Sequence, residues 1–138
     1  MTRRQTLNPA GLFDSLQYGF SQAMVVEGGR RLLLSGQVGV DENEKTVEGG
    51  IGPQMVKALD NIDYLLKQAG GDLSHVVMLR IYIAEPARDD QGPIADALRR
   101  YFPANPPPSS WIIVTGLSLP EWLIEIEAEA VLPDSGPR

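Results

Sequence analysis

The strictest pattern in this 138-residue chain is an alternation of apolar and acidic residues near its C-terminal end. Segment 123–132 reads LIEIEAEAVL, in which three glutamates, Glu125, Glu127 and Glu129, are separated by single apolar residues. Side chains along a β-strand point alternately to the two faces of its sheet. The pattern therefore predicts a strand with one apolar, buried face and one acidic face.

Four further strands and two helices are expected from local patterns. Apolar residues gather in four segments that predict strands, at 22–28, 31–35, 76–84 and 110–116. The first two are separated by the tight-turn pair Gly28-Gly29 and are expected to form a hairpin. Apolar residues recur at spacings of three and four over 52–69 and again over 92–102, which predicts two helices, each with one buried stripe.

The order of these elements predicts a single α+β domain over residues 1–138, with residues 1–17 as an irregular N-terminal segment. Hairpins combined with long crossovers imply a mixed sheet with both helices packed on one face. The other face would carry Met78, Arg80 and Tyr82 as well as the glutamates, with Trp111 as a further candidate. Such a face either closes by self-association or stays wet with a few exposed aromatic residues, as in many monomers.

The composition limits the kinds of partner that the protein is expected to bind. The chain has no cysteine, a formal net charge of -6 and a pI of about 4.7. The lack of cysteine excludes disulfides and thiolate metal sites and agrees with the reducing cytoplasm, where we expect the protein to reside. The negative charge argues against nucleic acid as the main partner. No apolar run approaches the roughly 20 residues of a membrane helix, so no membrane association is expected.

Four segments, taken in order and spacing, resemble the Rid/YjgF (RidA-like) family of enamine and imine deaminases. They read YGFSQA at 18–23, LLLSGQVGVD at 32–41, ALDNIDYLLKQAGGDLSHVV at 58–77 and LPEWLIEIEAEAVL at 119–132. The resemblance covers roughly residues 8–132. It implies a chorismate-mutase-like (YjgF-like) fold and a homotrimer whose sheets line a central barrel, with small-molecule clefts between subunits. It also implies that no metal and no organic cofactor is used.

Members of that family hydrolyse reactive 2-imino or 2-aminoacrylate acids and release ammonia, and the resemblance places several residues in such a site. Glu125 matches the glutamate that handles the attacking water, which makes it the candidate catalytic residue. Ser35 and Gly36 match the SGQ turn that approaches the ligand. On the residues alone, Glu125 can equally belong to a solvated acidic strip or pair with a basic residue.

The sequence also departs from the family pattern at the substrate-binding positions. Ser109 stands where typical members carry the arginine that holds the substrate carboxylate, and Phe20 stands where they carry a tyrosine. Trp111, two residues on, is expected either to stack on a planar ligand or to pack in the core or an interface. Losing a charged partner commonly costs about 2–5 kcal/mol in recognition, so simple 2-imino acids should bind poorly. Arg80 is a conceivable replacement cation, although a mid-strand arginine can instead pair with a glutamate.

Two classes of function follow. The first is a cofactor-independent hydrolase that deaminates an enamine, imine or related C–N substrate other than a simple 2-imino acid. The second is a non-catalytic trimer that binds a small metabolite and acts in regulation, which the missing arginine favours. Ribonuclease activity, a label sometimes attached to this family, is opposed by the acidic charge and by the lack of a His/Lys catalytic pair.

Overall fold

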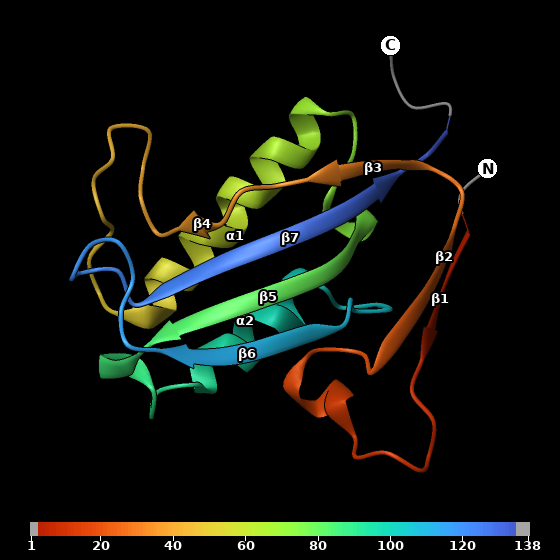
Figure 1. The fold of residues 1–138 in the computed structure, drawn as a ribbon, viewed down its shortest axis with the longest axis horizontal. Coiled ribbons are helices and arrows are strands. Elements are labelled where there is room, and N and C mark those ends of the chain that lie inside the picture. The colour runs from red at the N-terminus through yellow and green to blue at the C-terminus, as the bar shows by residue number, and fades with distance from the viewer. Residues whose placement is uncertain (1–2, 135–138) are drawn as a thin grey trace.

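A single mixed β-sheet with both helices behind it forms the body of the protein (Figure 1). The computed structural model describes residues 3–134. The strands of this sheet are β3 (Arg30–Leu33), β4 (Gln37–Val38), β5 (Val76–Ala84), β6 (Ser109–Val114) and β7 (Ile124–Leu132). Their order is β3-β7-β5-β6, with β4 also paired to β7. Only β5 and β6 run parallel, which confirms the predicted α+β fold with a mixed sheet.

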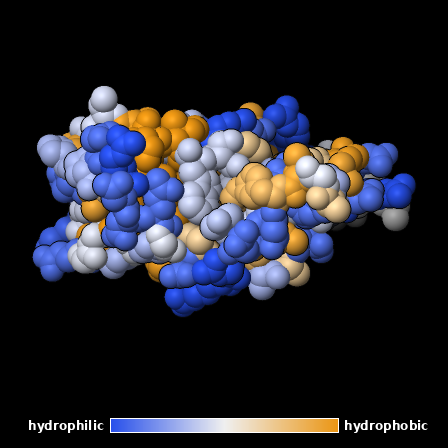
Figure 2. All heavy atoms as spheres, turned by 90° about the horizontal axis from the view of Figure 1, so that it is seen from below, coloured by the Kyte–Doolittle hydropathy of each residue, from blue (hydrophilic) through white to orange (hydrophobic). Residues whose placement is uncertain are grey.

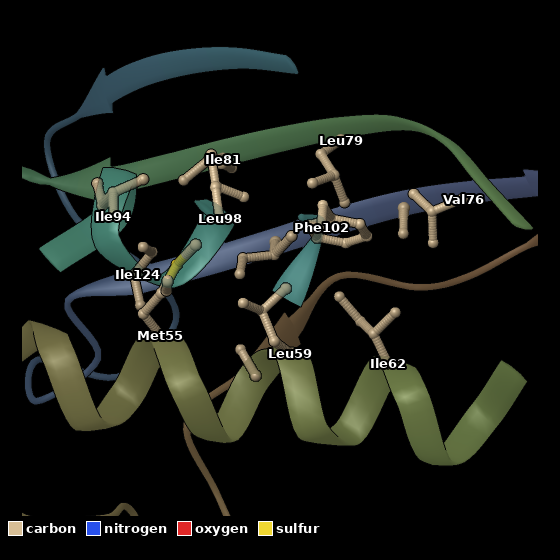
Figure 3. Close-up of a cluster of buried hydrophobic side chains, with 14 of the residues drawn as sticks. Met55, Leu59, Ile62, Val76, Leu79, Ile81, Ile94, Leu98, Phe102 and Ile124 are labelled. Carbon is tan, nitrogen blue, oxygen red and sulfur yellow. The ribbon is translucent and has the colours of Figure 1, made fainter. Parts of the chain in front are cut away.

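The helices α1 (Ile51–Gln68) and α2 (Gly92–Tyr101) lie within a residue of where apolar periodicity predicts them. Figure 3 shows Met55, Leu59 and Ile62 of α1 pointing toward the sheet, where Leu79 and Ile81 of β5 meet them. All five side chains are fully buried. Their burial fixes which face of the sheet belongs to the core. The 3₁₀ turns are η1 (Ser15–Tyr18), η2 (Leu73–His75) and η3 (Glu85–Ala87).

The predicted hairpin is wrong. The segment after Ser21 forms β2 (Ala23–Glu27), but β2 pairs with β1 (Arg3–Leu7) and not with β3. Gly28 and Gly29 adopt φ values of 73° and 89°, and at this point the chain turns away instead of folding back on itself. The hydrogen bonds of β3 go to β7, so a long-range pairing replaces the local one.

The expectation of an irregular N-terminal segment over residues 1–17 is also wrong for most of its described part. Residues 3–7 form β1, and η1 begins at Ser15 with the carboxylate of Asp14 as its N-cap. Arg4 ties β1 to the body because its guanidinium donates to the carbonyl of Val131 at 2.9 Å and also to the carbonyl of Ser74. The β1–β2 ribbon therefore stands beside the end of the sheet, linked to it at both ends (Figure 1).

No helix within residues 3–134 combines the length and the apolar character that crossing a membrane requires.

Replacing Leu59 by alanine should remove a fully buried side chain from the contact between α1 and the sheet. We expect the free energy of unfolding to fall by about 2–5 kcal/mol, because the lost transfer energy adds to the cost of a cavity. Urea denaturation at one fixed protein concentration measures this. Tyr64→Ala is the control on the same helix, since Tyr64 is 66% exposed and should change stability by about 0.5 kcal/mol or less. Equal effects of the two changes would contradict this account of the core.

Candidate functional site

The residues singled out from the sequence fall into two groups in the structure. Phe20, Ser109 and Trp111 lie together around a hollow of about 340 Å³. Phe13 and Tyr18 complete its wall, and we call these five residues the aromatic hollow. Sequence analysis did not single out Phe13 or Tyr18.

Phe20 is the centre of the aromatic hollow. Its ring lies 6.3 Å from that of Phe13 at an interplanar angle of 70°, and 5.9 Å from that of Trp111 at 55°. These edge-on and tilted arrangements are favourable for aromatic pairs. The backbone of Phe20 is held in place, because the Phe20 carbonyl accepts a hydrogen bond from the buried Ser15 hydroxyl at 2.7 Å.

Ser109 begins β6, directly after the prolines 106–108. The backbone N–H of Ser21 donates to the carbonyl of Pro107 at 3.3 Å, which joins the start of β2 to the approach of β6. The indole N–H of Trp111 donates to the Ser109 hydroxyl oxygen at 3.1 Å. The side chains of the two candidate binding residues are thus oriented by each other at the edge of the hollow.

The second group consists of Glu125 and the turn that precedes β4. A methyl group built on Gly36 would lie 2.8 Å from Cδ of Glu125 and nearer still to its Oε2. Glycine at position 36 is therefore what lets the carboxylate lie against the backbone. Ser35 is exposed, and its carbonyl accepts a hydrogen bond from Gln37 at 3.2 Å.

Within one chain the sheet separates the two groups. Trp111 is paired with Ile81, which points into the core, and Trp111 itself packs against the core. Glu125 is paired with Tyr82 on the face that carries no helix. The aromatic hollow and the Glu125 carboxylate therefore belong to opposite faces of the sheet.

On the helix-free face of the sheet, called here the open face, two of the three glutamates of β7 have a hydrogen-bond or ion-pair partner. The Tyr82 hydroxyl donates to Glu127 at 2.5 Å, and this bond raises the pKa of Tyr82. Arg80 and Arg31 bind Glu129 at 3.0 and 3.2 Å. The expectation that Arg80 pairs with a glutamate is confirmed.

That pairing also sets the ionisation of Glu129. Its hydrogen bond to Arg80 is the largest cause of a pKa below the ordinary value for a glutamate. Within residues 3–134, Glu125 is the one glutamate of β7 with neither a hydrogen bond nor an ion pair from its side chain. It is therefore the carboxylate on this strand that is available to a ligand or to water.

Metal binding has no evident place in the described part of the chain. Residues 3–134 contain no group of three or more histidine or acidic side chains arranged to hold a metal ion. The single histidine, His75, instead accepts a hydrogen bond from the backbone of Asp72 at 3.0 Å.

The sequence of this chain matches a known protein family and several individual proteins. The family described as "Endoribonuclease L-PSP" matches residues 15–132. A 2-iminobutanoate/2-iminopropanoate deaminase of Rattus norvegicus is 34% identical over 113 residues, which cover 81% of this chain and 79% of the relative.

Two solved structures are similar in fold. One is YyfB from Yersinia pestis, a protein of unknown function of the conserved Rid protein family. It is 36% identical with a TM-score of 0.87, over 94% of this chain and 98% of that chain. The other is RidA from an Antarctic Psychrobacter, 26% identical with a TM-score of 0.69, over 81% of this chain and 87% of that chain.

Replacing Gly36 by alanine should displace the carboxylate of Glu125 without unfolding the protein. The new methyl group would collide with the end of a flexible side chain, which can turn to another rotamer. A crystal structure of the variant measures the displacement. Gly11→Ala is the control, because a methyl group there meets nothing within 4 Å. An unmoved carboxylate in Gly36→Ala would contradict the role given to this glycine.

Replacing Arg80 by methionine should flatten the dependence of stability on pH in the acid range. The lowered pKa of Glu129 means that its ion pair stabilises the fold above the unfolded-state pKa of about 4.3, and that this contribution is lost as pH falls through the lower folded-state pKa. The partly exposed pair should contribute about 1 kcal/mol or less near pH 7. Denaturation at pH 7 and at pH 3 measures the change.

In that experiment Arg80→Lys keeps the positive charge and should retain most of the pH dependence. Parallel pH profiles for wild type and Arg80→Met would show that the pair contributes nothing.

Proposed function

This chain belongs to the family described as Endoribonuclease L-PSP, that of the Rid/YjgF proteins, and on that premise we propose that it is a deaminase acting on an enamine or imine other than a simple 2-imino acid. The proposed enzyme is a cofactor-independent hydrolase. The observation that carries the proposal is the Glu125 carboxylate, which lies against Gly36 and has no partner among residues 3–134. The relatives of this chain include a 2-iminobutanoate/2-iminopropanoate deaminase, which supports the proposed class of reaction.

A complete site in this proposal requires more than one subunit. Because the sheet separates the aromatic hollow from Glu125 within one chain, the two can act together only when copies of the chain face each other. We propose a homotrimer, as the family resemblance implies, whose open faces meet around a central barrel. In each cleft the aromatic hollow of one subunit would face Glu125, Ser35 and Gly36 of its neighbour.

The chemistry proposed for Glu125 is that of a general base. Its carboxylate accepts a proton from a water molecule while the water oxygen bonds to the imine carbon. That proton passes to the imine nitrogen, which gives a neutral carbinolamine. Glu125 then accepts the proton of the carbinolamine hydroxyl and delivers it to the nitrogen, so that the C–N bond breaks as the C=O bond forms, and ammonia leaves with a carbonyl product. An enamine enters the same route after its carbon takes up a proton to give the imine. Ser35 and Gly36 would supply backbone contacts to the substrate.

The restriction on substrate rests on Ser109. The family resemblance aligns this residue with the arginine that forms a bidentate pair with a substrate carboxylate. A hydroxyl already bound by Trp111 cannot replace that charge. Arg80 does not replace it either, because its guanidinium is bound to Glu129 on the open face.

A second candidate is a non-catalytic trimer that binds a metabolite in the same cleft. The uncharged lining of the aromatic hollow favours it, since binding there needs no catalytic group. Such a ligand would raise the melting temperature by mass action without being consumed. Ammonia release that depends on Glu125 separates the two candidates.

That nucleic acid is not the main partner, and that the protein is cytoplasmic, stay predictions from the sequence. The family description names an endoribonuclease, but a net charge of -6 opposes the binding of a polyanion.

Replacing Ser109 by arginine should enable the protein to hydrolyse 2-iminopropanoate. The substrate is generated from L-alanine by an amino-acid oxidase, and its hydrolysis is measured as ammonia release. The restored cation should raise the rate at low substrate concentration at least about tenfold, which corresponds to 1.4 kcal/mol. Adding Glu125→Gln to Ser109→Arg should abolish the gain. Glu127→Gln is the matched control on the same strand, because an amide oxygen can still accept from Tyr82.

Failure of ammonia release from a panel of imines and enamines, in wild type and in Ser109→Arg alike, would contradict the hydrolase proposal. A gain that survives Glu125→Gln would contradict the role of Glu125.

A further inference from the structure

The aromatic hollow carries information about its ligand that the reaction class does not. Four of its five lining side chains are aromatic, and the fifth is Ser109. None of the five carries a charge at neutral pH. A pocket of this kind selects ligands by ring shape and by the absence of a negative charge.

Its geometry suits a flat ring. The Phe20 ring is steeply inclined to the rings of Phe13 and Trp111, so neither of these rings stacks face to face on Phe20. Phe13 is 62% exposed and Tyr18 is 45% exposed, which leaves aromatic surface to be covered. Figure 2 shows hydrophobic side chains gathered toward its right, over the segment that links β1 to β2.

The Ser109 hydroxyl of the hollow can act as a hydrogen-bond donor. The Ser109 oxygen accepts from the Trp111 indole at 3.1 Å. Within residues 3–134 no group accepts the hydrogen of the Ser109 hydroxyl. That hydrogen can bond to a neutral nitrogen or oxygen of a ligand. A carboxylate in the same place would lose its hydration without gaining a cation, which is costly.

We propose that the substrate is an imine or enamine that carries an aromatic ring and no carboxylate at the end that enters the hollow. This inference rests on the proposed deaminase function, because it describes the same cleft. The ring fills the space between Phe13, Phe20 and Trp111, and Ser109 donates to the neutral polar group beside the ring. For an aryl ketimine the reaction is water plus Ar–C(R)=NH giving Ar–C(R)=O plus ammonia, with no oxidant or reductant.

Three stable probes test the inference by calorimetry and thermal shift with the wild-type protein. Benzamide has the ring and a neutral planar head, benzoate has the same shape with a negative charge, and acetamide has the head without the ring. We expect benzamide to bind at least about tenfold more tightly than either of the others, a difference of 1.4 kcal/mol. Equal or tighter binding of benzoate or acetamide, or no binding of benzamide, would overturn the inference.

Variants locate the binding in the aromatic hollow. Trp111→Leu should weaken benzamide binding, whereas Tyr64→Ala, a change on the exposed side of α1, should leave it unchanged. Ser109→Arg should reverse the preference toward benzoate, which also keeps the test open if Trp111→Leu does not fold. Benzamide binding that is insensitive to both changes in the hollow would place the ligand elsewhere and refute the proposal.

The outcomes separate this inference from the proposed function. Selective benzamide binding without hydrolysis of any imine would support the ligand class and contradict the deaminase. Imine hydrolysis that depends on Glu125, together with tighter binding of benzoate, would support the deaminase and refute the aromatic, uncharged substrate.

Discussion

The pairing of β7 with its neighbours is the constraint on which the rest of the structure depends. β7 lies between β5 and the edge strands β3 and β4, and its alternation assigns every side chain to the core or to the open face. A slip of one residue would bury three carboxylates under the helices, at a cost that hydrophobic packing could not offset. The same register brings Glu125 opposite β4, next to the turn at Gly36. One strand thus sets both the core and the position of the candidate base.

The register of β7 also divides the proposed site between the two faces of the sheet. Glu127 and Glu129 are held by Tyr82 and by Arg80 with Arg31, and Glu125 is left unpaired in the described part of the chain. The aromatic hollow lies on the other side of the sheet, built by the start of β6 and by the segment between β1 and β2. Because the two groups lie on opposite faces of one subunit, the proposed chemistry requires that subunits associate. This association also gives a reason for an open face that is rich in charged side chains.

Local periodicity was enough to predict the helices and most strands, because burial of Leu59 or Ile126 on one face imposes the pattern directly. The hairpin was wrong because Gly28-Gly29 permits a turn but does not determine which strands pair, and β3 finds its partner about a hundred residues away. Glu125 and Gly36 could be singled out because a motif resemblance carries them. Phe13 lies outside every motif, and Tyr18 begins the YGFSQA segment without a role attached to it, so that only the three-dimensional structure shows both residues lining one hollow with the start of β6.

The two parts of the proposed cleft rest on different physical supports. Glu125 sits on a strand that is hydrogen-bonded on both sides and backed by the core, so the position of its backbone is rigid. Tyr18 is the last residue of a short 3₁₀ turn, and Phe13 lies just before that turn, held by a ring contact with Phe20 and by a hydrogen bond from Gln22 to its carbonyl. Changes in such a segment alter the shape of a pocket at little cost to the fold. The proposed chemistry can therefore stay with β7 while the identity of the substrate is decided by the residues that precede β2 and begin β6.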